Sequence, residues 1–305
     1  MKHIFTLLFF TSLTTLSLIA EAKTCTSSTI LASLKSKKRF VWAEEKCSNT
    51  SISVSKPLTI SISGATIDGS NKLTMKWKGK HKCDEKPSSD TIFTVTGSKI
   101  TIKNLKMDWS PEGIHLKGSS NTVDNVTWIK ICEDGLTNTG KGNVIKNSLF
   151  QNAPDKCVQT NGGSATFINN TFKKCPRSIG SCSDKADPGN HPTANCKVPS
   201  FNTAISNKVY GCRNYAFRAS GKKSKKANGW LKAINNEFYD CDGAMQSEED
   251  GDVYASDNRV IGGTAFDTET KYGKYNAVIR ECNTSLEKGA RYYTNKKPKV
   301  DCNWD

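Results

Sequence analysis

A short pattern of apolar and polar positions recurs along most of the chain. An aliphatic residue is followed by a residue of any type, then by asparagine, and another apolar residue follows soon after. The asparagines are separated by 21, 22, 23, 37, 29 and 22 residues. They are Asn104, Asn125, Asn147, Asn170, Asn207, Asn236 and Asn258, the last without the aliphatic residue. A sustained period of this length indicates a repeat architecture.

A second pattern has the same period. Its apolar centres are separated by 22, 22, 21, 38, 28 and 21 residues, so its long gaps coincide with those of the first. They are Ile114, Leu136, Val158, Ile179, Phe217, Met245 and Phe266. The two long gaps predict insertions, at about residues 181–200 and at the lysine run of residues 222–226.

The repeating segments are short, rich in Val, Ile, Thr and Phe, and separated by Gly, Asn, Asp and Ser, which is typical of strands and turns. No stretch has a sustained helical period with caps. A β-sandwich would need hairpin turns and gives no reason for a fixed period. The pattern therefore predicts an all-β fold: a single-stranded right-handed parallel β-helix (β-solenoid) with rungs of about 22 residues. Asparagine suits a turn position because it tolerates left-handed geometry and can form ladders.

The N-terminus has the features of a secretory signal peptide. Met1-Lys2-His3 precede an apolar run from Ile4 to Ala20, and small residues flank Glu21. Serines and threonines interrupt the run, which disfavours an uncleaved membrane anchor. We therefore expect a signal peptide at residues 1–22, and one secreted, extracellular domain at residues 23–305 that has no membrane attachment.

All 12 cysteines follow the predicted cleavage point, which indicates up to six disulfides in an oxidising compartment. Zinc is a poorer explanation, because no CxxC pair exists and only three histidines remain after cleavage. Sequons at Asn49, Asn125, Asn169 and Asn283 permit N-glycosylation. The net charge of +15 calls for a polyanionic partner, and an exported chain meets acidic polysaccharide before nucleic acid.

Four charged residues precede the apolar centres by two positions. Glu112, Asp134, Lys156 and Arg177 are separated by 22, 22 and 21 residues, with Glu133 and Asp155 beside them. In a β-helix these positions stack about 4.8 Å apart. Because residues i and i+2 of a strand share a face, the column can face solvent only if the chain bends. Gly113 and Gly135 allow a bend on two rungs; Cys157 and Ser178 do not obviously do so.

This column has two interpretations. A solvated ladder of opposite charges contributes little to stability and has no function. Alternatively, clustered carboxylates can bind a hard cation such as calcium, and adjacent cations lower the pKa of a lysine toward that of a base. A cation next to a lysine base suits elimination across a uronate.

The residues around the column carry a resemblance to a known family. The segments are Glu112-Gly113-Ile114-His115, Cys132-Glu133-Asp134-Gly135-Leu136-Thr137, Asp155 to Gly163, and Lys174 to Arg177. They resemble polysaccharide lyase family three, the compact pectate lyases of bacteria, fungi and plant-parasitic nematodes. The resemblance covers about residues 65–180 and fades afterwards into rungs alone.

The resemblance implies roles for individual residues. Glu112, Glu133 and Asp134 would bind Ca2+, Lys156 would abstract the C5 proton of galacturonate, and Arg177 would hold the carboxylate or assist the leaving oxygen. Lys174 would line the groove, and Glu85 would match a further acidic residue. Glu112 stands where aspartate is usual, and the lysine that commonly follows Thr137 is missing, with Lys141 as its substitute.

The expected function is that of a monomeric pectate lyase acting on the pectate (polygalacturonate) polymer. Removing the C5 hydrogen creates an enolate-like dianion, so Lys156 must act as a base, and we expect Arg177, Lys174 and calcium to lower its pKa. A polygalacturonase-type hydrolase is disfavoured, because the paired aspartates, the NTD phrase and the GHG phrase of that family do not occur. A non-catalytic β-helix that binds acidic polysaccharide is the other alternative.

Overall fold

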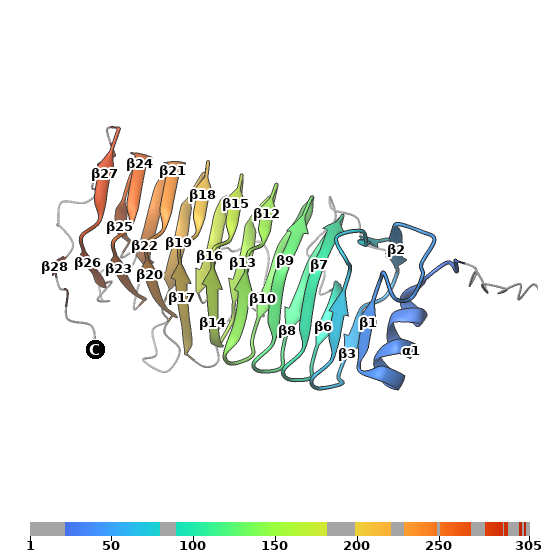
Figure 1. Cartoon of the computed structure of the whole chain (residues 1–305). Coiled ribbons are helices and arrows are strands. Elements are labelled where there is room, and N and C mark those ends of the chain that lie inside the picture. Colours follow the sequence, from blue (N-terminus) through green and yellow to red (C-terminus); the bar gives the residue numbers. More distant parts are fainter. Residues whose placement is uncertain are drawn as a thin grey trace, which may run out of the picture.

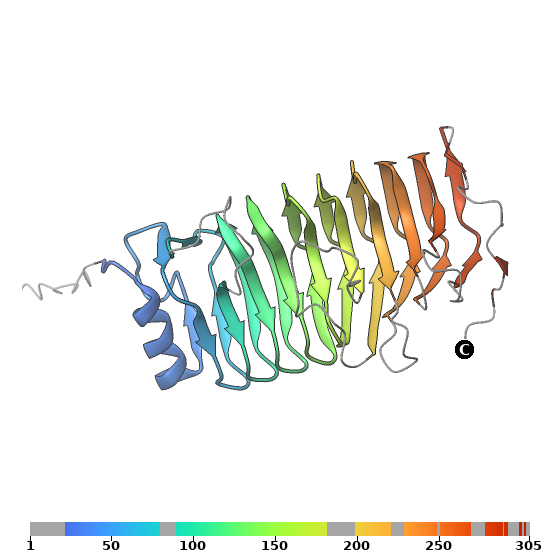
Figure 2. The same cartoon turned by 180° about the vertical axis from the view of Figure 1, so that it is seen from behind.

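The strands of the computed structural model run parallel and stack along one axis, each pairing with its counterpart one rung on (Figures 1 and 2). The structure describes residues 22–79, 90–181, 199–220, 229–248, 251–269, 278–288, 290–291, 299–300 and 302. The register confirms the predicted period, because Ile114, Leu136 and Val158 pair directly. The parallel β-helix predicted from the repeat is therefore correct. The predicted signal peptide, apart from Ala22, lies outside the described residues.

Each rung has three strands, one on each face of the solenoid. A nine-stranded sheet forms one face, with β3 (Leu58–Ile60), β6 (Thr91–Val95), β8 (Ser110–Leu116), β10 (Ile131–Asn138), β13 (Lys156–Thr160), β16 (Arg177–Ser181), β19 (Tyr215–Ser220), β22 (Gly243–Glu248) and β25 (Phe266–Glu269). We call this sheet the front sheet.

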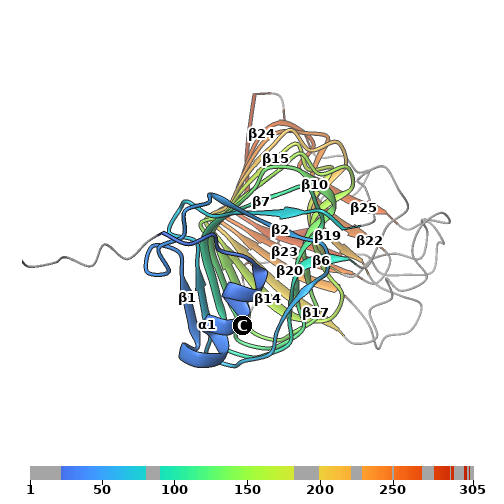
Figure 3. The same ribbon diagram turned by 90° about the vertical axis from the view of Figure 1, so that its right-hand side faces the viewer.

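A 19-stranded sheet forms the other two faces of the solenoid, which Figure 3 shows end-on. The strand pairing shows that these two faces share β7 (Thr101–Asp108) and β9 (Thr122–Trp128). One face adds β1 (Arg39–Val41), β4 (Thr66–Asp68), β11 (Asn143–Lys146), β14 (Gly163–Ile168), β17 (Ser200–Ile205), β20 (Gly229–Ile234), β23 (Asp252–Ser256), β26 (Val278–Cys282) and β28 (Lys299–Val300). The other adds β2 (Ser51–Val54), β5 (Thr74–Trp77), β12 (Leu149–Gln151), β15 (Thr171–Lys173), β18 (Lys208–Tyr210), β21 (Glu237–Cys241), β24 (Arg259–Gly263) and β27 (Ser285–Glu287).

The core consists of columns of apolar side chains that run along the axis. All seven predicted apolar centres are buried, with at most 1% of the surface exposed. On a neighbouring face the rings of Trp128, Phe150 and Phe172 stack, with centroids 4.1 and 5.1 Å apart. Burial of apolar surface on every rung stabilises the solenoid and fixes its register.

The repeated asparagines belong to two adjacent columns, not to one. Asn104, Asn125 and Asn147 have positive φ, between 52° and 56°, and occupy the left-handed bend between two faces. From Asn170 onwards the asparagines lie one residue later and are buried in the interior. The 23-residue step from Asn147 to Asn170 marks the change of column.

The interior asparagines form a hydrogen-bonded ladder. The side-chain amide of Asn170 donates to Asn207 (3.0 Å), that of Asn207 to Asn236 (2.9 Å), and that of Asn236 to Asn258 (2.9 Å). Each side-chain oxygen on this path also accepts the backbone N–H of the preceding asparagine. The ladder satisfies polar groups that the bend would otherwise leave buried without partners.

One helix that the sequence pattern did not predict covers the N-terminal end of the solenoid. Helix α1 (Ser27–Lys37) buries Ile30 and Leu34 and contacts β1 and β2. Thr26 caps it in a capping box with Thr29, and Lys38 ends it in the left-handed conformation. Two buried apolar positions are too few to give a helical period. Within the described parts of the chain, no helix has the length and apolar character needed to cross a membrane.

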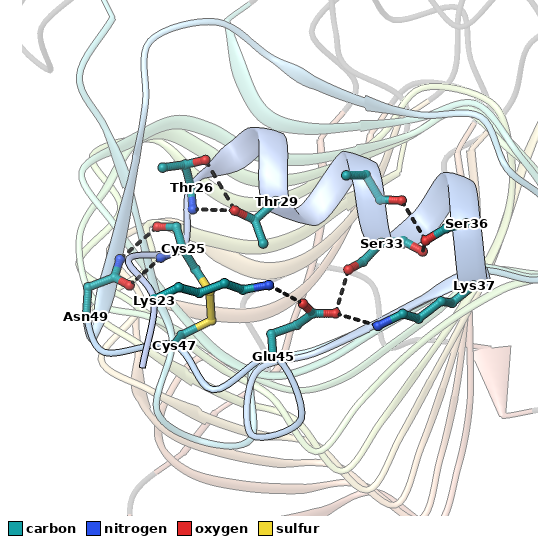
Figure 4. Close-up of polar contacts among 11 residues, drawn as sticks. Lys23, Cys25, Thr26, Thr29, Ser33, Ser36, Lys37, Glu45, Cys47 and Asn49 are labelled. Carbon is teal, nitrogen blue, oxygen red and sulfur yellow. Dashed lines mark hydrogen bonds and ion pairs between the residues drawn. A yellow bond between two sulfur atoms is a disulfide. The ribbon is translucent and has the colours of Figure 1, made fainter. Parts of the chain in front are cut away.

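A carboxylate holds α1 to the loop after β1 (Figure 4). Glu45 accepts hydrogen bonds from Ser33, from Lys23 (2.9 Å) and from Lys37 (3.2 Å). The bond from Ser33 and those from the two lysines lower the pKa of Glu45 to about 2. The Cys25–Cys47 disulfide joins the segment just before α1 to the same loop.

Disulfides are present as expected along the length of the solenoid. The described pairs are Cys25–Cys47, Cys157–Cys175, Cys212–Cys241 and Cys282–Cys302, and Cys132 is also disulfide-bonded. The other three cysteines lie outside the described residues. The expectation of a disulfide-rich chain is confirmed.

Replacing Asn207 by Ala should destabilise the protein by about 2–4 kcal/mol, because Asn170 loses its acceptor and the Phe167 carbonyl loses its donor inside the core. Urea denaturation measures the change. Asn214→Ala removes an exposed asparagine and is the control. Equal stability of the two variants would contradict the structural role of the ladder.

Replacing Glu45 by Gln should lower the unfolding free energy at pH 7 by about 1 kcal/mol. Because the folded pKa of Glu45 (about 2) lies below its ordinary value of 4.5, its contribution is fully present above pH 4.5 and is lost as pH falls toward 2. Thermal melts between pH 2 and pH 7 should therefore converge for the wild type and Glu45→Gln at the acidic end. Glu44→Gln, which alters an exposed pair with Arg39, is the control. A constant difference across this range would contradict the prediction.

Candidate functional site

A column of small residues breaks the alternation of side chains at the start of each front-sheet strand. Gly113, Gly135, Cys157 and Ser178 lie one residue before the buried apolar centres, and they are buried too. The strand pairing skips this position on successive rungs, passing from Asp134–Lys156 directly to Leu136–Val158. A Cβ atom at Gly113 would lie 2.2 Å from the indole nitrogen of the buried Trp128. Two consecutive positions thus face inward, and the residue before them faces outward.

The bend explains, on all four rungs, how the charged residues can face outward although they lie only two positions before a buried apolar centre. Glu112 pairs in register with Asp134, Asp134 with Lys156, and Lys156 with Arg177. Their side chains are partly covered, with 14%, 8%, 12% and 22% of the side-chain surface exposed, respectively. Two carboxylates and two cations therefore lie in sequence on the outside of the solenoid, with little surrounding water.

The acidic end of the column is short of positive charge. Burial, Asp134 and Glu133 raise the pKa of Glu112 to about 8. Burial, more than the charge of Asp155, raises the pKa of Asp134 to about 6 against the lowering effect of Lys156 and Arg177. His115 lies 3.6 Å from Glu112, but burial and Lys117 lower its pKa to about 4, so it is neutral at pH 7.

The chemistry of the acidic end fits a hard cation. Oε2 of Glu112 and Oδ1 of Asp134 are buried and have no hydrogen-bond partner among the described residues. Oxygen ligands of this type suit calcium. In the arrangement described, however, no three acidic, histidine or cysteine side chains of the described residues are grouped closely enough to hold a metal ion by themselves. A cation would draw these carboxylates closer together or take further oxygens from a ligand.

At the basic end, Asp155 forms ion pairs with both positively charged side chains, Lys156 and Arg177. Lys156 Nζ lies 2.7 Å from Asp155 Oδ2 and 3.9 Å from Asp134 Oδ1, and Arg177 lies 3.4 Å from Asp155 Oδ1. Burial lowers the pKa of Lys156, but Asp134 and Asp155 together raise it above its ordinary value. In this arrangement the net change in the pKa of Lys156 is upward, contrary to the expected lowering, and the effect expected of calcium stays a prediction. Arg177 does lower the pKa, but its effect is smaller than that of the carboxylates.

Asp155 is the residue whose importance the sequence analysis missed. It was placed beside the column, but no role was assigned to it. Its position immediately before Lys156 was the available signal. That the side chains of consecutive residues would meet depends on the bend at Cys157, which the sequence pattern did not predict.

The other predicted site residues differ in position. Glu133 is half-buried and adjoins Asp134, and its charge acts on Glu112. Lys174 is exposed at the corner three residues before Arg177, with φ of 53°. Lys141 lies in the turn that follows the other end of β10, so the structure does not bring it to the column. Glu85 lies outside the described residues.

Comparison with known proteins gives one family match and several relatives. A family model described as pectate lyase matches residues 43–229, which include the whole column. Pectate lyase H of Emericella nidulans is 35% identical over 162 residues, covering 50% of this chain and 60% of that protein. Pectate lyase E of the same organism is 34% identical over 147 residues, covering 44% and 54%, respectively. The chain thus spans little more than half the length of these relatives.

Solved structures support the fold alone. An alginate lyase from a Paenibacillus species superposes with a TM-score of 0.60 at 11% identity, covering 88% of this chain and 97% of that chain. The catalytic domain of a GH87 α-1,3-glucanase has a TM-score of 0.50 at 12% identity, covering 80% and 55%, respectively.

Replacing Asp155 by Asn should lower the pKa of Lys156, because it removes the carboxylate 2.7 Å from the ammonium group. NMR titration of the lysine side chains, with Lys156 assigned by its substitution, measures this change. Asp124→Asn is the control, since Asp124 pairs with Lys146 on another face. An unchanged or higher pKa of Lys156 would contradict the assigned charge interaction.

Proposed function

Because the chain belongs to the pectate lyase family, we propose that it cleaves α-1,4-polygalacturonate by calcium-dependent β-elimination and releases 4,5-unsaturated oligogalacturonates. The observation that carries this proposal is the outward column Glu112–Asp134–Lys156–Arg177, held in register on four successive rungs. It combines a cation-binding end with a proton-accepting end about one rung apart.

Elimination from galacturonate needs a base for the C5 proton, positive charge at the substrate carboxylate and a hydrogen-bond donor for the leaving oxygen. The C5 hydrogen lies α to a carboxylate, so its removal places further negative charge next to an existing one. Lys156 is the group that takes this proton, and Arg177 offers a planar pair of donors to the carboxylate or to the leaving oxygen. Lys174, exposed at the corner beside Arg177, binds a neighbouring uronate.

Glu112, Glu133 and Asp134 are the residues that would hold calcium. When bound, this ion supplies positive charge that stabilises the substrate carboxylate as it becomes enolate-like. One oxygen each of Glu112 and Asp134 is buried without a hydrogen-bond partner, and this together with the raised pKa values of both groups supports the assignment. Glu112 is longer than the aspartate usual in the family, and it pairs in register with Asp134 on the next rung.

Asp155 positions the reacting cations. One oxygen contacts Lys156 and the other contacts Arg177, so Asp155 links the two side chains across adjacent rungs. Since Asp134 and Asp155 both favour the charged form of Lys156, proton abstraction requires that their negative charge be compensated. Arg177 already contributes to this compensation.

We also propose that the protein is a secreted, extracellular monomer whose catalytic domain comprises residues 23–305. The disulfides support an oxidising compartment, and the net charge of +15 suits a polyanionic substrate such as pectate, which a secreted chain meets before nucleic acid.

Polygalacturonate incubated with the mature protein and calcium should develop ultraviolet absorbance from the unsaturated product, and a chelator should abolish it. Lys156→Ala should lower kcat by about 10²–10⁴-fold while substrate binding persists. Lys146→Ala, on another face, is the control and should leave kcat unchanged.

Two outcomes would contradict this function. Reducing ends that form without ultraviolet absorbance would indicate hydrolysis. Binding of polygalacturonate without turnover in the wild type would indicate a non-catalytic β-helix.

A further inference from the structure

A second column of side chains runs beside the charged one, at the corner where each rung enters the front sheet. Its members lie two residues after the paired core residues Met107, Trp128, Phe150 and Phe172. We call it the corner column, and it consists of Trp109, Lys130, Asn152 and Lys174. Each member precedes its charged-column residue by three or four positions, so the two columns are neighbours along the whole site.

Trp109 is the most exposed large apolar side chain of the described residues, at 50%. The other two in this class, Phe201 and Trp230, are 47% and 39% exposed and contact each other edge-on on another face. Trp109 instead contacts Lys130, whose Nζ lies 3.8 Å from the centre of the ring. An aromatic ring and an ammonium group are therefore held together at the corner that precedes Glu112 along the chain.

The backbone at the corner makes this tryptophan unusual. Most rungs adopt a left-handed conformation here, and Asn152, Gly211, Asp240 and Gly262 are residue types that tolerate it. Trp109, with φ of 54°, has a bulky side chain in the same conformation. Lys174 and the more distant Lys288 also have this conformation without being Gly, Asn or Asp. A bulky residue kept in a strained conformation at the edge of a site suggests a functional contact.

A uronate unit offers complementary chemistry to this pair. The C–H face of its ring packs against an aromatic ring, and its carboxylate pairs with an ammonium group. We propose that Trp109 and Lys130 form an outer subsite that binds one galacturonate unit of a polyuronate chain. This inference rests on the proposed function and extends it along the axis.

The position of the subsite predicts which substrates use it. Trp109 lies on the rung of Glu112, two rungs from Lys156, which is ~10 Å along the axis. An oligomer centred on Lys156 extends along the axis in both directions. A short oligomer therefore ends before it reaches Trp109, whereas a long one reaches it. The subsite should therefore strengthen binding of long chains and leave the chemical step unchanged.

The test measures binding in the Lys156→Ala background, with hexagalacturonate and trigalacturonate as probes in calorimetry. Adding Trp109→Ala or Lys130→Ala should weaken hexagalacturonate binding about tenfold and change trigalacturonate binding less than about twofold. In the active protein the same substitutions should raise KM for polygalacturonate without changing kcat. Trp109→Phe should retain most of the affinity.

Matched controls separate this inference from the function on which it depends. Trp230→Ala removes an exposed tryptophan from another face, and Lys72→Ala removes an exposed lysine. If the Trp109→Ala and Lys130→Ala variants bind hexagalacturonate as tightly as these controls do, the subsite is overturned and the lyase assignment stays intact. Absence of both binding and turnover in the wild type would overturn the proposed function, and the subsite with it.

Discussion

The inward bend at the start of each front-sheet strand is the constraint on which the rest of the structure depends. Because Gly113, Gly135, Cys157 and Ser178 point into the core together with the apolar residues that follow them, the residues before them face outward. Without this bend the four charges of the column would be buried, at a prohibitive cost in desolvation. The same small residues continue as Ala216, Ala244 and Ala265 on later rungs, where no charged column exists. The bend is thus a property of the fold, and the column uses it.

The chemistry of the site follows from the order of charges on consecutive rungs. Two carboxylates lie together at the poorly solvated acidic end of the column. This raises their pKa values and favours the binding of a cation. Two cations share Asp155, which fixes their position but stabilises the charged lysine.

The period of the repeat, the apolar centres and the charged column could be predicted from the sequence because each depends on spacing alone. Features that depend on packing could not be. The bend at Cys157 and Ser178 and the contact of Asp155 with Lys156 follow from the core behind them. Helix α1 was missed because only Ile30, Ser33 and Leu34 are buried. The asparagines of two adjacent columns were read as one, since a shift of one residue in the period is small. Lys141 was proposed, on its residue type alone, to replace the lysine that commonly follows Thr137. The length of β10 separates Lys141 from the charged column, so it does not lie at the site.

The measurement that tests the account most directly is a crystal structure of Lys156→Ala with calcium and a galacturonate oligomer. We expect calcium on Glu112, Glu133 and Asp134, with the substrate carboxylate beside it. We also expect a sugar C5 to face position 156 and Arg177 to contact the same sugar. Calcium or oligomer bound on another face, with the column in contact with neither, would contradict this expectation.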